Sequence, residues 1–123
     1  MKDENKISVI GGGLAGCEAA YQISKLGIDV DLYEMRPNTK TEAHNTEYLA
    51  ELVCSNSFRS DDKEYNAVGV LHEELRMSDS LIMKTADSNK VPAGSALAVD
   101  RNDFAKEINN IIKSNSNIKI INK

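Results

Sequence analysis

Hydrophobic and polar residues alternate in a regular way over the first third of the chain. Residues 6–10, KISVI, form a short β-branched apolar run that predicts a strand. Three glycines follow, and residues 14–26 have the character of a helix, with Gly27 where a helix commonly ends. In residues 28–34, apolar side chains alternate with aspartates, as in a strand. This order predicts a βαβ unit with parallel strands and a right-handed crossover.

The segment after this unit is less regular. Residues 35–45 are polar and contain Pro37, so they predict a loop, and residues 47–52 predict a short helical turn. Residues 53–62, VCSNSFRSDD, have no clean period and also predict a loop. The middle of the chain is therefore expected to be irregular.

Apolar spacing and turn residues predict regular elements again in the second half. These are a helix over 67–77 with Asn66 as N-cap, a short helix over 80–88, a turn at 91–94, a strand at 96–99, a helix from Asp100 to about 113, and a strand at 118–121. We expect an α/β fold: a Rossmann-like βαβ unit with additional helices and an incomplete doubly wound sheet. Because such a sheet needs further strands, residues 1–123 are interpreted as the N-terminal part of a dinucleotide-binding domain, with the remaining domains of a longer protein absent.

The glycines between the first strand and helix match the dinucleotide-binding pattern G-x-G-x-x-G. In that pattern the first glycine permits a tight turn, the second lets the backbone approach a pyrophosphate, and the third allows close packing of helix on strand. Glu34, at the end of the next strand, is placed to accept hydrogen bonds from ribose hydroxyls, which favours FAD or NAD over NADP, although Arg36 would weaken that preference. The predicted cofactor-binding residues are Gly11, Gly12, Gly13, Leu14, Ala15, Gly16, Glu34 and Arg36.

Composition narrows the class of protein. Fifteen basic and 19 acidic residues give a net charge of −4, which argues against a general polyanion binder but leaves a local basic patch open. Two cysteines are too few for a disulfide framework or a closed zinc site, and no metal is predicted. Without a long apolar run or a secretory signal, no membrane contact is expected and the cytoplasm is the default location.

Four further stretches make the chain similar to a known family. The first βαβ unit resembles that of flavoproteins, and the following segments resemble the FAD- and folate-dependent tRNA (uracil-5-)-methyltransferases. The stretches that carry this resemblance are EMRP at 34–37, AELVCSNSFRSD at 50–61, NAVGVLHEELR at 66–76 and VPAGSALAVDR at 91–101. The family is several times longer than this chain, and its NAD(P)H-binding portion and second functional cysteine have no counterpart here.

The resemblance implies an activity and its participants. The family transfers the methylene of methylenetetrahydrofolate to C5 of a T-loop uridine in tRNA, with FAD as carrier and reductant and NAD(P)H as electron source. It implies Cys54 as the catalytic cysteine, which would add to C6 of uracil as a thiolate. Arg59 is placed to stabilise that charge, and Cys17 is expected to be a small core residue. Two alternatives stay open: the same chemistry on ribosomal RNA, and a truncated FAD-binding module without catalysis.

Overall fold

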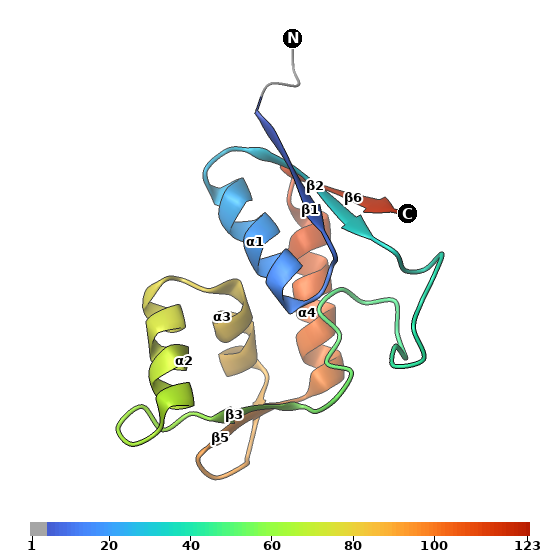
Figure 1. Ribbon diagram of the computed structural model, residues 1–123. Coiled ribbons are helices and arrows are strands. Elements are labelled where there is room, and N and C mark those ends of the chain that lie inside the picture. Colours follow the sequence, from blue (N-terminus) through green and yellow to red (C-terminus); the bar gives the residue numbers. More distant parts are fainter. Residues whose placement is uncertain (1–4) are drawn as a thin grey trace.

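The computed structural model describes residues 5–123; the first four residues, which bear on the expected absence of a secretory signal, lie outside this range. The elements in chain order are β1 (Lys6–Ile10), α1 (Leu14–Lys25), β2 (Asp29–Glu34), β3 (Ser57–Ser60), α2 (Ala67–Met77), α3 (Leu81–Ser88), β4 (Lys90–Val91), β5 (Ala96–Val99), α4 (Arg101–Ser114) and β6 (Ile118–Asn122). Figure 1 shows two groups of elements, a sheet of β1, β2 and β6 with α1 and α4, and a second group around β3 and β5.

The first group confirms the predicted βαβ unit. Strands β1, β2 and β6 pair in that order and are all parallel, with Leu32 opposite Val9 on one side and Ile120 on the other. Gly27 follows α1 with a φ of +74° and donates its N–H to the Ser24 carbonyl, as expected of a helix-ending glycine. Helices α1 and α4 contact each other and the sheet, so both crossovers cover the same face (Figure 1).

The hydrophobic core lies between this sheet and its two helices. Val30 and Leu32 of β2 are buried against Phe104 and Ile108 of α4 and against small residues of α1. Cys17 belongs to that group and is fully buried, which confirms its expected role as a core residue. Truncation of a core side chain such as Leu32 to alanine costs about 2–5 kcal/mol in stability, so this core fixes the sheet that supports the glycine turn.

A second, antiparallel sheet was not predicted from the sequence. β5 pairs with β3 on one side and β4 on the other, so residues 57–60 form a strand where a loop was expected. The pairing of β3 shifts register between Ser57 and Ser60, and such a bulge hides the two-residue period that identifies a strand. Phe58 anchors β3 by meeting Phe104 edge to face, with ring centroids 5.5 Å apart.

The predicted helical turn at residues 47–52 is also wrong. Leu49 and Ala50 form a non-helical turn, in which the Ala50 N–H donates to the Gly12 carbonyl at 2.8 Å and Ala50 has a φ of +54°. Both side chains are buried. Contacts with the glycine turn therefore determine this segment, and a local apolar pattern could not reveal them.

Each of the remaining helices begins after a capping residue. Asn66 and Asp100 agree with the prediction, whereas Ser80, predicted as the first residue of its helix, is the cap that precedes it. Asn66, Ser80 and Asp100 precede α2, α3 and α4, and each side chain accepts a backbone N–H of its own first turn. The carboxylate of Glu18 on α1 also accepts the N–H groups of Leu81 and Ile82, which joins the two groups of elements.

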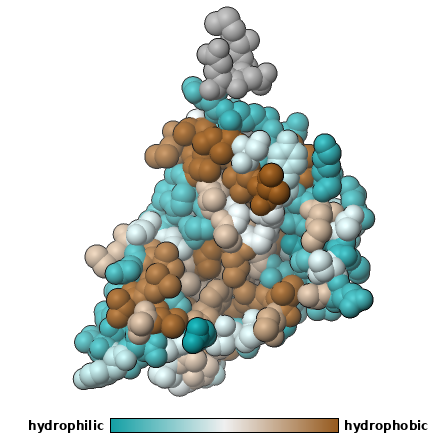
Figure 2. Space-filling model, viewed as in Figure 1, coloured by the Kyte–Doolittle hydropathy of each residue, from teal (hydrophilic) through white to brown (hydrophobic). Residues whose placement is uncertain are grey.

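The outer face of α2 is partly apolar. Figure 2 shows hydrophobic surface gathered over this helix, where Val70, Leu71 and Met77 are exposed. Throughout residues 5–123, every helix is too short or too polar to cross a lipid bilayer.

Candidate functional site

The glycine turn, residues 11–16, has a backbone shape that larger residues would not permit. Gly11 has a φ of +100° and donates its N–H to the Tyr33 carbonyl at 2.8 Å. A Cβ on Gly16 would lie 1.7 Å from the Gly11 carbonyl oxygen, so α1 approaches β1 only because Gly16 has no side chain. A Cβ on Gly13 would meet nothing within 4 Å, so the space beside this residue is open. Gly16 thus allows the helix to pack closely on the turn, and Gly13 leaves space for a ligand beside it.

The start of α1 is suited to an anion. Gly13 is the N-cap and offers no side-chain acceptor to the first turn, whose N–H groups lack partners within the helix by geometry. Those groups belong to Leu14, Ala15 and Gly16, and the helix dipole adds a partial positive charge there. With the open space beside Gly13, this end of the helix can receive a phosphate without rearrangement.

Glu34 lies directly under the glycine turn. Its Oε2 accepts the Gly12 N–H at 2.9 Å, and its Oε1 accepts the backbone N–H and the Nε–H of Arg36 at 2.9 and 2.8 Å. Burial by itself would raise the pKa of the Glu34 carboxyl, but the hydrogen bonds and charge of Arg36 lower it below its ordinary value. Glu34 is therefore a carboxylate at neutral pH, as a ribose acceptor must be.

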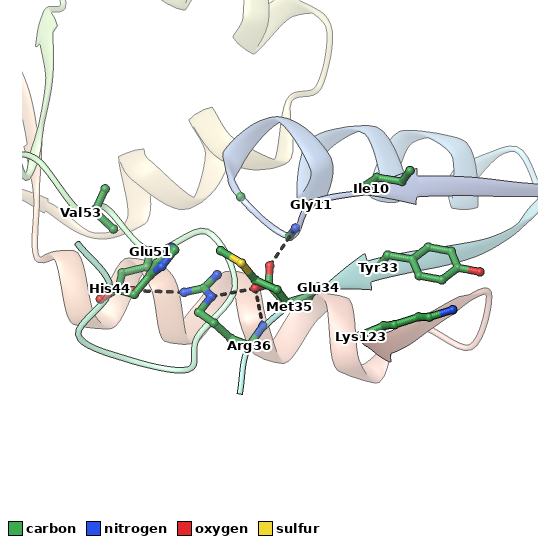
Figure 3. Close-up of a pocket in the computed structure, with 12 residues that line it drawn as sticks. Ile10, Gly11, Tyr33, Glu34, Met35, Arg36, His44, Glu51, Val53 and Lys123 are labelled. Carbon is green, nitrogen blue, oxygen red and sulfur yellow. Dashed lines mark hydrogen bonds and ion pairs between the residues drawn. The ribbon is translucent and has the colours of Figure 1, made fainter. Parts of the chain in front are cut away.

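Arg36 does not reach freely into solvent. It is 4% exposed, and its Nη1 lies 3.1 Å from Oε2 of Glu51 (Figure 3). The other oxygen of Glu51 accepts the backbone N–H groups of Asn45 and Thr46 at 2.9 and 3.0 Å. Glu34, Arg36 and Glu51 thus form a buried carboxylate–guanidinium–carboxylate triad, which we call the acid–Arg triad.

These groups surround a cavity of about 460 Å³, within the usual range for small-molecule sites. It is lined by Ile10, Gly11, Gly12, Gly13, Tyr33, Glu34, Met35, Arg36, His44, Glu51, Val53 and Lys123 (Figure 3). Of the predicted cofactor residues, the cavity brings together the three consecutive glycines, Glu34 and Arg36. Leu14, Ala15 and Gly16 are outside this lining, at the start of α1.

Cys54 lies in a neighbouring hollow of about 500 Å³. This hollow is lined by Leu14, Glu51, Leu52, Val53, Cys54, Ser55, Ser57 and Arg59. Glu51 and Val53 line both spaces, so the thiol stands beside the glycine-turn cavity. Cys54 is exposed, whereas burial raises the pKa of the Cys17 thiol to about 12 and keeps it protonated. Between the two cysteines, only Cys54 can meet a substrate.

Sequence reasoning missed Glu51, although it lies within the AELVCSNSFRSD stretch. Its partner Arg36 is 15 positions away, and no helical or strand period connects them. A buried carboxylate in a loop becomes recognisable only when its guanidinium partner is located. The histidines add little: His44 lines the cavity edge, and His72 is buried with its Nδ1 2.9 Å from Oδ1 of Asp61.

Comparison with known proteins gives concordant results. A family model described as glucose inhibited division protein A matches residues 6–123. The chain is 61% identical over 117 residues to the methylenetetrahydrofolate--tRNA-(uracil-5-)-methyltransferase TrmFO of Bartonella tribocorum, covering 95% of this chain and 25% of that protein. It is 56% identical over 120 residues to the protein of the same name from Jannaschia sp., covering 98% and 26%. The chain thus spans about a quarter of the length of these curated relatives.

A solved structure shares the fold. The structure of Aquifex aeolicus GidA in the form II crystal superposes with a TM-score of 0.73 at 18% identity, covering 97% of this chain and 19% of that one. The arrangement of both groups of elements therefore recurs in a protein of distant sequence.

Proposed function

Because the chain belongs to the glucose inhibited division protein A family, we propose that it forms the flavin-binding, cysteine-bearing part of a folate-dependent tRNA (uracil-5-)-methyltransferase. The methyl group would go to C5 of a T-loop uridine in the cytoplasm. Methylenetetrahydrofolate is the proposed carbon donor and NAD(P)H the proposed electron source.

The residues around the glycine turn fit the ADP half of FAD. Gly13 leaves room for the pyrophosphate, and the N–H groups of Leu14, Ala15 and Gly16 are aligned to bind it. The ionised Glu34 would accept hydrogen bonds from the ribose hydroxyls, with Gly11 and Gly12 forming the floor of the turn. Reduced FAD, when bound, would supply the one-carbon unit and the hydride that completes the methyl group.

Cys54 would activate the uracil ring. Its thiolate sulfur forms a bond to C6, and the electron pair displaced onto C5 attacks the methylene carbon. Loss of the C5 proton and cleavage of the bond between the methylene carbon and its carrier nitrogen would leave an exocyclic methylene while sulfur stays on C6. Addition of a hydride to that methylene would then complete the methyl group, restore the C5–C6 double bond and expel the Cys54 thiolate. The guanidinium of Arg59, in the same hollow, would favour the ionised thiol.

One observation carries this proposal: the glycine-turn cavity and the Cys54 hollow share Glu51 and Val53. A nucleotide cofactor seated in the first space would therefore lie next to the space that holds the thiol. A dinucleotide-binding module without catalysis would have no need of an exposed cysteine at this position.

The proposal is tested with Cys54→Ser and Cys17→Ser in the whole protein. We expect Cys54→Ser to keep its flavin absorbance and to lose methylation of a tRNA transcript by about a thousandfold or more, because serine is a far weaker nucleophile. Cys17→Ser is the matched control, since its hydroxyl still reaches the Gly12 carbonyl that the Cys17 thiol contacts at 3.4 Å.

Three outcomes would overturn parts of the proposal. Full methylation by Cys54→Ser would remove the nucleophile assignment. Methylation of an rRNA transcript but not of tRNA would change the substrate. Flavin binding without methylation of either RNA by the wild-type protein would reduce the function to a binding module.

A further inference from the structure

The acid–Arg triad has an unusual charge balance for a pocket that contains an arginine. Glu34, Arg36 and Glu51 are all buried to more than nine-tenths in their side chains, at 6%, 3% and 8% exposure. Two carboxylates and one guanidinium leave a net charge of −1 beside the place where a ribose would bind. Lys123 also lines the cavity, but its side chain runs alongside Tyr33 and points away from the triad (Figure 3).

Glu51 is the group that makes this balance negative. Without it, Glu34 and Arg36 would neutralise each other at 2.8 Å. Glu51 also binds Nη1 of Arg36 at 3.1 Å, so that Nε and Nη1 of the guanidinium each have a carboxylate partner. Its own position is fixed from the other side by the N–H groups of Asn45 and Thr46.

We propose that Glu51 is a specificity-determining residue that makes the glycine-turn cavity reject a ribose 2′-phosphate. In dinucleotide sites that accept NADP, an arginine near the end of the second strand binds the 2′-phosphate. Arg36 occupies that position in the chain, but Glu34 and Glu51 bind its Nε and Nη1, and the excess negative charge repels a phosphate. The inference rests on the proposed function, in which NADPH must be kept from the place of the flavin.

The test measures binding rather than catalysis. ADP-ribose and its 2′-phosphorylated form are titrated calorimetrically into the deflavinated whole protein, as wild type and as Glu51→Gln. The glutamine oxygen can still accept the N–H groups of Asn45 and Thr46, but the side chain no longer carries a charge toward Arg36. We expect the wild-type preference for ADP-ribose over its 2′-phosphate to narrow by about tenfold or more in Glu51→Gln.

Two further variants show whether the charge of Glu51, rather than the stability of its loop, sets the preference. Glu47→Gln removes a carboxylate from the same loop, beside Arg36 in a neighbouring hollow, and should leave the preference unchanged because its side chain is exposed. Glu51→Asp keeps the charge on a shorter side chain and should retain the rejection even where it lowers stability. If the ligand preference changes in every variant that loses stability, whether or not the variant keeps the charge at position 51, the proposal is overturned.

The outcomes separate this inference from the proposed function. If both proteins bind ADP-ribose and Glu51→Gln keeps the wild-type preference, the role of Glu51 is wrong while the flavin site stands. If the wild-type protein binds neither ligand and takes up no FAD, the nucleotide site itself is wrong, and the inference falls with it.

Discussion

The glycine turn, residues 11–16, and the Cys54 segment, residues 49–60, adopt left-handed backbone conformations by different means. In the glycine turn the positive φ belongs to Gly11, for which this conformation has no steric cost. In the Cys54 segment it belongs to Ala50 and Arg59, at +54° and +73°. Non-glycine residues in this region carry about 1–2 kcal/mol of strain each.

The two regions are also held by different forces. Close packing fixes the glycine turn, because a Cβ on Gly16 would lie only 1.7 Å from the Gly11 carbonyl oxygen. Side chains fix the Cys54 segment: Ser55 Oγ accepts the Ser57 N–H, and the Asn56 amide donates to the Val99 carbonyl at 3.1 Å. The shape of the glycine turn thus depends on the absence of side chains, whereas the Cys54 segment depends on its particular side chains.

The largest expected effect is at Gly16. Gly16→Ala places a methyl group against the Gly11 carbonyl, which no rotamer change can relieve, so the free energy of unfolding should fall by at least about 3 kcal/mol. Gly13→Ala is the matched control, because its Cβ meets open space and should weaken flavin binding without loss of stability. Urea unfolding of both variants measures this difference, and equal stabilities would contradict packing as the cause.

Glu18 connects the two groups of elements, because it extends from α1 to the start of α3. Its carboxylate accepts Ser80 Oγ at 2.6 Å and the N–H groups of Leu81 and Ile82 at 3.0 and 2.9 Å. Glu18→Ala should cost about 2 kcal/mol of stability, as expected when a helix start loses its acceptors. Glu18→Gln should lower the stability less, since the amide oxygen of glutamine can still accept a hydrogen bond from one of these N–H groups. The midpoint of thermal unfolding measures this loss. If both variants unfold at the wild-type midpoint, the contact between Glu18 and the start of α3 does not contribute to stability.

Substitutions of Arg59 test whether its backbone is strained and whether its guanidinium supports activity. Arg59→Gly should raise the free energy of unfolding by about 1 kcal/mol, because glycine adopts the same φ without strain, and should lower methylation. Arg59→Ala keeps the strain while removing the guanidinium, so it should lose activity without gaining stability. Chemical denaturation and the methylation assay are measured on the same samples. A glycine variant that is less stable than wild type would refute the strain argument.

The smallest effect near neutral pH concerns the two carboxylates at the ends of β2 and β3. Burial alone would raise the pKa of Asp61, but hydrogen bonds from His72 and Arg76 lower it, as Arg36 lowers that of Glu34. A lowered folded pKa stabilises the protein above the ordinary values of 4.5 for Glu34 and 3.8 for Asp61. That contribution is lost as the pH falls through the folded values.

Unfolding free energies at pH 7, 5, 4 and 3 would measure this loss. The wild type should be nearly unchanged between pH 7 and 5 and should lose stability below about pH 4.5. Glu34→Gln and Asp61→Asn should each begin less stable and show a shallower acid decline. An equally steep decline in a variant would exclude that carboxylate as a source of acid sensitivity.

The sequence predicted those elements that are determined by residues close together in the chain. Asn66 and Asp100 indicate their helices through side chains that accept their own first-turn N–H groups, and the glycine pattern indicates the first βαβ unit. β3 was missed because four residues with a bulge carry no readable period. The Ala50 turn was missed because its partner is Gly12, far away in the chain.

The candidate site divides in the same way. Glu34 could be predicted from the number of positions that separate it from the glycines. Cys54 could be predicted only from a family resemblance, because no fold rule specifies a cysteine there. Glu51 required the folded structure, since an ion pair between loop residues leaves no periodic signal. The glycines and Glu34, which suit a common cofactor, can thus be predicted from a single sequence. Glu51, which is proposed to set the selectivity, cannot.

The order of strands in the parallel sheet has a consequence for biosynthesis. Val30 of β2 pairs directly with Ile118 of β6, although most of the chain separates them. During translation β1, α1 and β2 can associate early, but the central strand keeps one unpaired edge until the ribosome has made β6. Contacts of such long sequence separation form slowly, because a large loop must close first. The group around β5 would then fold in the interval and bring α4 into place, so that β6 joins β2 only after every element between them has been made.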